Sequence, residues 1–349
     1  MTSSQNTEKH LLSMPLVSII IPCYNEENTI GLLLEAIYLQ TFSRAAMEII
    51  ISDGFSVDQT REKVAEFCRT HPDMAVRIVD NPARIIPSAL NLAILAAHGD
   101  YIVRLDAHSI PKSDYIERCV AGLEAHLGDN IGGVWKIKPG GLGWMAESIA
   151  EAASHPLGVG DARYRFGAKQ GEVDTVPFGS YRRDLFDRIG LFDESLLTNE
   201  DYELNVRIRE SGGRVWMDPL IETTYIARPT IGALAKQYWR YGFWKARMLT
   251  RYPSTLRWRQ ALPPLFVLGV IGLVILSMFG YAGRVGLSVV LGLYGAVLLA
   301  GAFPNTLKNR KPGYLVGIPL AISTMHFSWG LGFLWSLVRM PVERIRGRF

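Results

Sequence analysis

The feature that most constrains the fold is the separation of acidic residues from long apolar runs. Residues 1–222 carry 21 Lys and Arg and 32 Asp and Glu, whereas residues 223–349 carry 16 Lys and Arg and a single acid, Glu343. Three runs in the second part contain no charged residue: 264–283, 285–303 and 313–338. A helix of about 20 residues is about 30 Å long, which matches the hydrocarbon core of a bilayer. We therefore expect a soluble domain followed by a membrane region.

The segment 231–260 interleaves aromatic and basic side chains just before the first apolar run. This composition is also typical of proteins that bind single-stranded nucleic acid. Because apolar runs of membrane-spanning length follow directly, we expect interfacial helices on a lipid bilayer and no nucleic-acid partner.

Charge also predicts how the chain is oriented in the membrane. The polar tail 1–15 lacks the apolar core of a signal peptide, so we expect a cytosolic catalytic domain on an integral inner-membrane protein. The connection near Arg284 then lies outside, and the basic cluster 308–311 lies inside, as the positive-inside rule favours. A full third span would place the basic tail (Arg344, Arg346, Arg348) outside. We therefore expect 313–338 to fold as a broken or re-entrant hairpin.

The first part alternates short apolar runs with helical patterns. We predict helices over about 28–40, 58–68 and 87–97, and a further strand that begins with Val173–Val176 and closes on a Gly179-Ser180 turn. Alternation of this kind indicates an α/β domain with a mostly parallel sheet. The four principal strands are expected at Val17–Pro22, Glu48–Ser52, Ala75–Val79 and Tyr101–Leu105.

Polar residues follow three of these strands. Asn25 and Glu26 come after the first, Asp53 ends the second, and Asp106 and His108 follow the fourth. Taken alone, Asp-x-His is more typical of a capped turn than of a metal site. Three polar strand ends that meet at one sheet edge instead indicate a ligand site. There a carboxylate and an imidazole can hold a divalent metal beside a phosphate-bearing substrate.

A second group of polar residues comes later in the chain. Glu200 and Asp201 follow Asn199, which can cap a helix, and acids are favoured in a first helical turn. The alternative is that one of them is a general base. The glycine-rich loop 158–165, with Arg163 and Arg165, suits an anion contact or a plain solvated loop equally well. We expect Gly179-Ser180, directly after Phe178, to form a turn that would let a ligand approach the backbone.

Five segments together resemble family 2 inverting glycosyltransferases, which have the GT-A fold. They are Val17–Glu27, Ser52-Asp53-Gly54, Gly99–His108, Phe178–Arg183 and Asn199–Gly212. Within the family the chain is most similar to the ExoA-like succinoglycan glucosyltransferases, through Asp106-Ala107-His108-Ser109, Val173–Val176, Asn199–Leu204 and Gln237–Gly242.

The resemblance implies roles for individual residues. Asp201 is the expected catalytic base, with Glu200 beside it. Asp106 and His108 occupy the metal position, where His replaces the family's usual second Asp. We therefore expect Mn²⁺ to be favoured over Mg²⁺. The nucleotide donor is expected to contact Pro22, Tyr24, Asn25, Glu26, Asp53, Arg84 and Asp106, and the acceptor or diphosphate to contact Arg163, Arg165, Phe178, Gly179, Ser180, Gln237, Arg240 and Tyr241.

The implied activity is transfer of a sugar from a nucleotide-sugar, most simply a UDP-hexose, to a polyprenyl-linked or other membrane acceptor. A GT-A domain over residues 16–230 would carry it, followed by interfacial helices at 231–260 and a membrane region at 261–349. A polyprenyl-phosphate sugar synthase is an alternative within enzymes. A non-catalytic, membrane-tethered nucleotide-binding scaffold is an alternative of another class. Sugar, acceptor, linkage and oligomeric state do not follow from the sequence.

Overall fold

The computed structural model describes residues 16–167 and 169–345. These residues form two compact units: residues up to 136 together with 167–225, and residues 137–166 together with 226 onward. We call them unit 1 and unit 2. The predicted polar tail at 1–15 lies outside the described residues, as do Arg346 and Arg348, on which the predicted topology partly rested.

One half of the sheet in unit 1 is parallel, as predicted. Its strands lie in the order β3-β2-β1-β4, and all seven residues of β1 are buried. Continuous β-branched runs suit such strands because helices cover both faces of a parallel sheet. Register places Cys23 of β1 beside Asp53 of β2, so the polar residues that follow these strands start from one edge. The bounds are β1 (Val17–Cys23), β2 (Met47–Asp53), β3 (Ala75–Asp80) and β4 (Tyr101–Arg104).

The other half of the sheet contains antiparallel pairs. β4 pairs antiparallel with β8, and the order continues β8-β6-β9-β5, with β7 added to β9. The sheet is therefore mixed as a whole. The bounds are β5 (Ile110–Pro111), β6 (Asn130–Lys138), β7 (Gly171–Glu172), β8 (Ser180–Arg182) and β9 (Val215–Ile226).

The strand predicted at Val173–Val176 is wrong. Strand pairing ends with β7 at Glu172, and Val173 adds one backbone bond to Val215. The physical reason lies just downstream. Pro177 has no N–H to donate to a ladder, and Phe178 and Gly179 both have positive φ, so this stretch cannot continue as a pleated strand.

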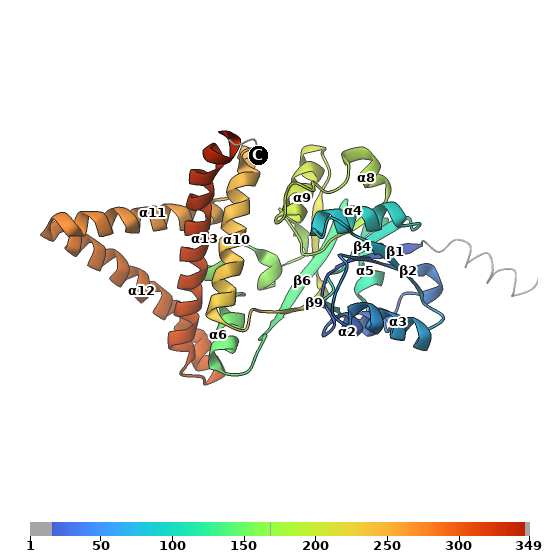
Figure 1. Ribbon diagram of the computed structural model, residues 1–349. Helices are drawn as coiled ribbons and strands as arrows, with labels where there is room; N and C mark the ends of the chain where they lie inside the picture. The colour runs from blue at the N-terminus through green and yellow to red at the C-terminus, as the bar shows by residue number, and fades with distance from the viewer. Residues whose placement is uncertain (1–15, 168, 346–349) are drawn as a thin grey trace, which may run out of the picture. The chain divides into compact units, whose positions relative to one another are not determined.

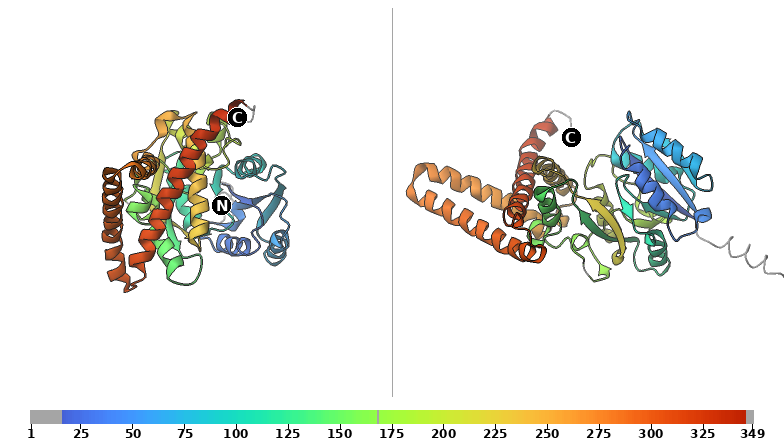
Figure 2. Two further views of the ribbon diagram at one scale, coloured as in Figure 1. Left: turned by 60° about the vertical axis from the view of Figure 1, so that its left-hand side comes forward. Right: turned by 90° about the horizontal axis from the view of Figure 1, so that it is seen from below.

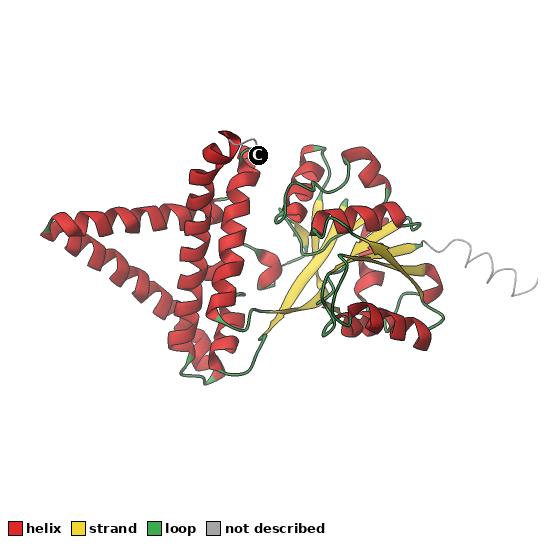
Figure 3. Cartoon of the chain, viewed as in Figure 1, coloured by secondary structure: helices red, strands yellow, loops and turns green. Residues whose placement is uncertain are grey.

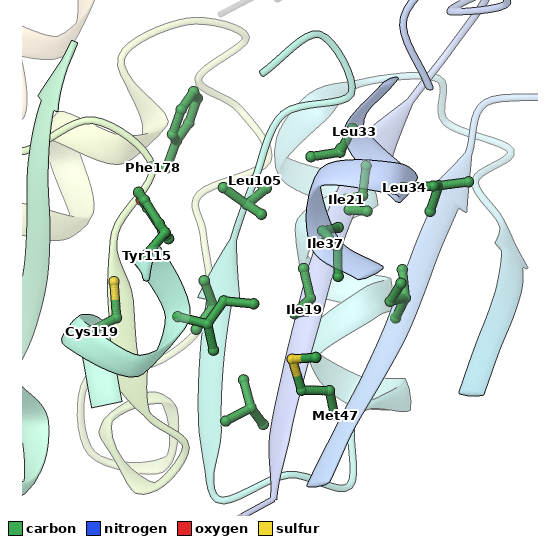
Figure 4. Packing of buried hydrophobic residues seen from close by; sticks show 14 of the residues in the cluster. Ile19, Ile21, Leu33, Leu34, Ile37, Met47, Leu105, Tyr115, Cys119 and Phe178 are labelled. Carbon is green, nitrogen blue, oxygen red and sulfur yellow. The ribbon is translucent and has the colours of Figure 1, made fainter. Parts of the chain in front are cut away.

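Helices cover the sheet and complete the core of unit 1 (Figure 1). Figure 4 shows Leu33, Leu34 and Ile37 of α2 packed against Ile19 and Ile21 of β1. The core fixes β1, β2 and β4 rigidly, and so fixes the residues at their carboxyl ends. The helices of unit 1 are α2 (Ile30–Tyr38), α3 (Thr60–Thr70), α4 (Ile86–Ala96), α5 (Tyr115–Glu124), α8 (Asp184–Ile189) and α9 (Glu200–Glu210), with a 3₁₀ turn η1 (Arg44–Ala46).

Unit 2 is built almost entirely of helices (Figure 3). Three of them are long and apolar enough to cross a membrane: α11, α12 and α13. The helices are α6 (Trp144–Ala152), α7 (Pro156–Val159), α10 (Ile231–Leu249), α11 (Trp258–Phe279), α12 (Tyr281–Asn309) and α13 (Tyr314–Ile345), with 3₁₀ turns η2 (Arg163–Arg165) and η3 (Pro253–Thr255).

The expected broken hairpin at 313–338 is wrong, because α13 is one uninterrupted helix of 32 residues. Pro319 removes one hydrogen bond without ending the helix. Ile318, Ala321 and Ile322 are fully buried on either side of it, and this packing offsets the loss. The hairpin lies earlier in the chain, where α11 and α12 meet at Gly280.

Candidate active site

The turns that follow β1 and β2 are joined through Asn25. Its backbone is left-handed, with φ of 55°. The Asn25 N–H donates to Ser56 Oγ at 2.8 Å, and its side-chain oxygen accepts from the N–H of Val57 at 2.9 Å. Asn tolerates this backbone conformation better than most residues do. The side chain of Asn25 therefore shapes the edge of the site.

Asp53 is almost completely buried and well satisfied. Its Oδ1 accepts from the Ser56 hydroxyl at 2.5 Å, and its Oδ2 accepts from Arg61 Nε at 2.6 Å. Pro22, which lies within β1, is likewise buried. Direct contact of Asp53 with a base or ribose stays a prediction, because a ligand would have to share its oxygens with Ser56 and Arg61.

Exposed aromatic rings gather at the same edge. The Arg84 guanidinium lies 6.0 Å from the ring centroid of Tyr24 and 5.9 Å from that of Phe55. Both rings keep more than a third of their surface exposed. Flat, exposed rings beside a cation suit stacking of a nucleobase. Sequence reasoning missed Phe55, although its place between Gly54 and Ser56 in a predicted donor motif was an available signal.

Glu26 contacts His108 of the predicted metal position and orients its imidazole ring. His108 Nδ1 lies 3.1 Å from Glu26 Oε1, and this contact favours the tautomer with its lone pair on Nε2. Burial acts to raise the pKa of Glu26, but hydrogen bonds from His108 and Thr29 outweigh it and hold the pKa below its ordinary value. A carboxylate that orients a histidine in this way is the usual support of a metal-ligating imidazole.

Asp106 and His108 supply one carboxylate and one imidazole, the donor types of a partial ligand set, and their binding of a divalent cation stays a prediction. Among residues 16–167 and 169–345, no group of three or more His, Cys, Asp or Glu side chains is arranged to hold a metal by itself. One carboxylate and one imidazole would therefore need oxygens from the substrate to complete the coordination shell. Such a site suits a cation that arrives with a diphosphate.

Arg104, the last residue of β4, lies at the centre of the site. Its Nε donates to Asp106 Oδ1 and its Nη2 donates to Glu200 Oε1, each at 3.1 Å. The guanidinium is buried, and its Nη1 has no hydrogen-bond partner within the described part of the chain. Sequence reasoning did not identify Arg104, because it reads as one residue of an apolar strand. It joins the metal position to the acidic pair of α9.

Glu200 and Asp201 lie at the start of α9. Burial raises the pKa of Glu200 to about 7, and the charges of Asp201 and Asp106 add to this rise while Arg104 opposes it. Burial likewise raises the pKa of Asp201, against the opposing effects of Arg104 and of the Tyr202 N–H, which donates to Asp201 Oδ1 at 2.7 Å. Raised carboxylate pKa values in a buried cluster are typical of acid–base sites.

Glu200 and Asp201 lie in the first turn of α9, where the helix dipole favours acids, as the structural alternative expects. Asn199 has φ of 73° and caps no N–H with its side chain, and the Thr198 hydroxyl donates to the carbonyl of Leu197. The expected side-chain cap by Asn199 is therefore wrong. The left-handed backbone at Asn199 instead turns the chain into α9.

Phe178, Gly179 and Ser180 are buried next to β4. The Gly179 carbonyl accepts from the Arg104 N–H at 3.0 Å. A Cβ at Gly179 would lie 2.3 Å from the Tyr181 hydroxyl, so only glycine fits there. This segment supports the strand that carries Arg104. Its predicted contact with an acceptor stays a prediction.

The other five predicted residues belong to unit 2. Arg165 is buried and lies over the ring of its neighbour Tyr164, whereas Arg163 is exposed. Gln237 Nε2 donates to the Tyr241 hydroxyl at 3.1 Å across one turn of α10, on which Arg240 is exposed. Their predicted contacts with the acceptor or diphosphate stay predictions.

Comparisons with known proteins identify the family to which this chain belongs. The profile described as Glycosyl transferase family 2 matches residues 18–190. The succinoglycan biosynthesis protein ExoA of Rhizobium meliloti (strain 1021) is 31% identical over 318 residues, covering 90% of this chain and 93% of the relative. The chain belongs to glycosyltransferase family 2. It is thus a glycosyltransferase, and both the predicted family and the predicted enzyme class are confirmed.

Two further proteins are similar over nearly the whole chain. A dolichyl N-acetyl-α-D-glucosaminyl phosphate 3-β-D-2,3-diacetamido-2,3-dideoxy-β-D-glucuronosyltransferase of Methanococcus voltae is 26% identical, over 93% of this chain and 98% of the relative. The solved mannosyltransferase PcManGT from Pyrobaculum calidifontis, in complex with GDP-Man and Mn²⁺, has a TM-score of 0.59 at 19% identity and covers 95% of this chain and 94% of that chain. The GT-A fold followed by apolar helices is confirmed.

Proposed function

We propose that this glycosyltransferase moves a sugar, with inversion, from a nucleoside diphosphate donor to a lipid-linked glycan at the cytosolic face of the inner membrane. One observation carries the proposal: in the acidic pair Glu200–Asp201 the buried Glu200 accepts from Arg104, which also donates to Asp106 of the metal position. The residue next to the proposed base and the carboxylate of the metal position are thereby joined through one side chain.

Asp201 takes the proton of the acceptor hydroxyl in this mechanism. The acceptor oxygen forms its bond to the anomeric carbon as the bond from that carbon to the diphosphate oxygen breaks, and the nucleoside diphosphate leaves with the electron pair. The raised pKa of Asp201 makes its carboxylate a stronger base than an exposed aspartate. Glu200, whose pKa is raised to about 7, accepts a hydrogen bond from Arg104 and so helps to position its neighbour Asp201.

On the donor side, Asp106 and His108 would hold Mn²⁺, and Glu26 orients the imidazole. The cation, when bound, neutralises the charge that develops on the leaving diphosphate. Imidazole suits Mn²⁺ better than Mg²⁺, which prefers oxygen ligands. The Tyr24 and Phe55 rings, with Arg84 between them, are positioned to receive the base, for which we propose uracil.

A lipid-linked acceptor is supported by the second relative, whose name describes transfer to a dolichyl-linked sugar phosphate. The first relative is named for the biosynthesis of succinoglycan, a polysaccharide. The apolar helices of unit 2 add physical support, because they would keep the enzyme at the surface where a lipid-linked acceptor lies.

The test is Asp201→Asn in full-length protein in membranes, with Glu200→Gln as the matched control. Asp201→Asn is expected to abolish transfer while donor binding stays within a few-fold, because the amide fills the same space and accepts no proton. Glu200→Gln is expected to retain measurable transfer with an altered pH dependence. Normal turnover by the Asp201→Asn variant would refute the assignment of the base.

The acceptor class is tested separately with the unmodified enzyme. Membranes are supplied with a nucleotide-sugar and either a polyprenyl phosphate or a polyprenyl-diphosphate-linked glycan. We expect label to enter the glycan. Transfer to the bare lipid phosphate alone would instead assign the chain as a polyprenyl-phosphate sugar synthase.

A further inference from the structure

Helix α13 lies side by side with α10 (Figures 1 and 2). Glycines allow this close approach. A Cβ at Gly332 of α13 would lie 2.3 Å from the Trp239 carbonyl oxygen of α10, and one at Gly242 of α10 would lie 2.1 Å from the Trp329 carbonyl oxygen of α13. The two backbones are thus in direct contact, so that α10 and α13 form one packed pair over this length.

Charged and polar contacts hold α13 at several points along its length. Lys311, just before its first turn, pairs with Glu147 of α6 at 2.8 Å. In its middle, His326 Nε2 lies 2.8 Å from the carbonyl oxygen of Leu157 in α7. Near its end, Glu343 pairs with Arg247 of α10. These contacts hold α13 against α6, α7 and α10 of unit 2.

Helix α10 itself is unsuited to hydrocarbon. It carries Lys236, Arg240, Lys245 and Arg247 within 19 residues. A charged side chain at the bilayer centre is costly unless it faces a bundle interior or a water-filled cavity, and Arg240 is exposed. If α13 crossed the bilayer, its contacts would draw α10 with it and bring the exposed Lys236 and Arg240 into the membrane. Lys245 is buried and Arg247 pairs with Glu343, so these two cations would stay inside the protein.

The α11–α12 hairpin has the opposite character. The two helices contact α13 along part of their length, where Trp329 Nε1 donates to the Gln260 carbonyl at 3.3 Å and His326 Nδ1 lies 2.9 Å from the Tyr294 hydroxyl. Beyond these contacts they extend to a shared tip (Figure 2). The most apolar 18-residue stretch of each helix is largely exposed. Only 17% of this stretch is buried in α11 and 11% in α12, whereas 39% is buried in α13. Their 22 and 29 residues correspond to lengths of about 33 and 44 Å, which are enough to cross a hydrocarbon core of about 30 Å.

We propose that the lipid bilayer holds this protein by the α11–α12 hairpin alone, while α10 and α13 lie along the membrane surface on the side of the catalytic domain. Basic side chains at the base of the hairpin suit this surface: Lys308, Arg310 and Lys311 would face anionic headgroups. Arg284, near the tip of the hairpin, would then lie on the opposite side of the membrane.

This arrangement removes the conflict with the positive-inside rule that a third span creates. Two crossings return the chain to the starting side before Lys308, and α13 then stays there. The proposal concerns how the chain is anchored and does not depend on the transfer reaction, so a labelling experiment tests it independently of activity.

The experiment introduces one exposed cysteine at a time into the full-length protein and labels it with a membrane-impermeant maleimide, in sealed inside-out and right-side-out vesicles. The background is Cys68→Ser, because the other two cysteines, Cys23 and Cys119, are buried. Leu95→Cys in α4 reports the catalytic domain, Tyr281→Cys reports the hairpin tip, and Val342→Cys reports the end of α13. All three positions are exposed.

We expect Leu95→Cys and Val342→Cys to label in the same vesicles, and Tyr281→Cys to label only in vesicles of the opposite orientation. Labelling of Val342→Cys from the side opposite to Leu95→Cys would show that α13 crosses, and would overturn the proposal. So would failure of Tyr281→Cys to label from the far side. Labelling of all three after detergent is added shows that each cysteine is reactive.

Discussion

Arg104→Met removes the buried cation that joins Asp106 to Glu200 while keeping most of the side-chain volume. The Arg104 guanidinium lies 3.1 Å from Glu200 Oε1, and both side chains are less than a tenth exposed. Two unit charges about 4 Å apart interact by about 4 kcal/mol at an effective dielectric constant of about 20. Since 1.36 kcal/mol corresponds to one pH unit, the pKa of Glu200 should rise by up to about 3 pH units.

Loss of the Arg104 charge should also change the pH dependence of sugar transfer. Arg104 lowers the pKa values of both Glu200 and Asp201, so its loss raises them. The pair titrates together, and transfer needs the ionised base. We therefore expect the acidic limb of the pH profile of kcat/KM to move upward by about one to three pH units.

The assay is initial-rate transfer from pH 5 to pH 10, with thermal melting to confirm that each variant folds. Arg104→Lys keeps the positive charge and should stay close to the wild-type profile. Arg182→Met removes another arginine of the sheet, which donates to the Leu123 carbonyl and cation–π stacks on Tyr101, and should lower stability without moving the profile. A uniform loss of rate in Arg104→Met, with the acidic limb unmoved, would refute the reasoning.

Three other predictions test separate parts of the structure. Asp106→Ala should weaken Mn²⁺-dependent binding of a nucleoside diphosphate by about tenfold or more, measured by calorimetry, and equal affinity with and without Mn²⁺ in the wild type would remove the metal role. Glu200→Gln should stabilise the fold at pH 8 by roughly 3 kcal/mol and little at pH 4. The pKa of Glu200 in the folded wild type, about 7, lies above the ordinary 4.5, so the wild type loses stability as pH rises from 4.5 to 7. An equal effect of the substitution at both pH values in denaturant titrations would contradict this. Gly332→Leu should lower the melting temperature by separating α10 from α13, whereas Gly269→Leu, which meets nothing within 4 Å, should not.

Local patterns were sufficient for much of the fold. The β-branched runs predicted all four parallel strands to within a residue or two, since a strand buried on both faces must be apolar throughout. Similarly, the uncharged runs predicted the helices α11 and α12. The strand predicted at Val173–Val176 failed because Pro177 and two residues with positive φ outweigh a β-branched pattern.

The candidate site was only partly predictable. Asp106, His108 and Asp201 were recognisable from motifs, but Arg104 was not, because its role depends on partners 2 and 96 residues away in the chain. Nothing near Arg104 in the sequence indicates that its guanidinium will meet Glu200. The hydrogen bond from His108 to Glu26, which spans 82 residues, is of the same kind.

By itself, the sequence determined which segments are apolar, which strands are buried and which family the chain resembles. These properties depend on composition and on short periodic patterns. Only the tertiary structure decided that α13 packs on α10 and that Arg104 joins two acidic motifs. Both depend on contacts between segments distant in the chain, and hydropathy does not specify whether an apolar helix buries its surface in protein or in lipid.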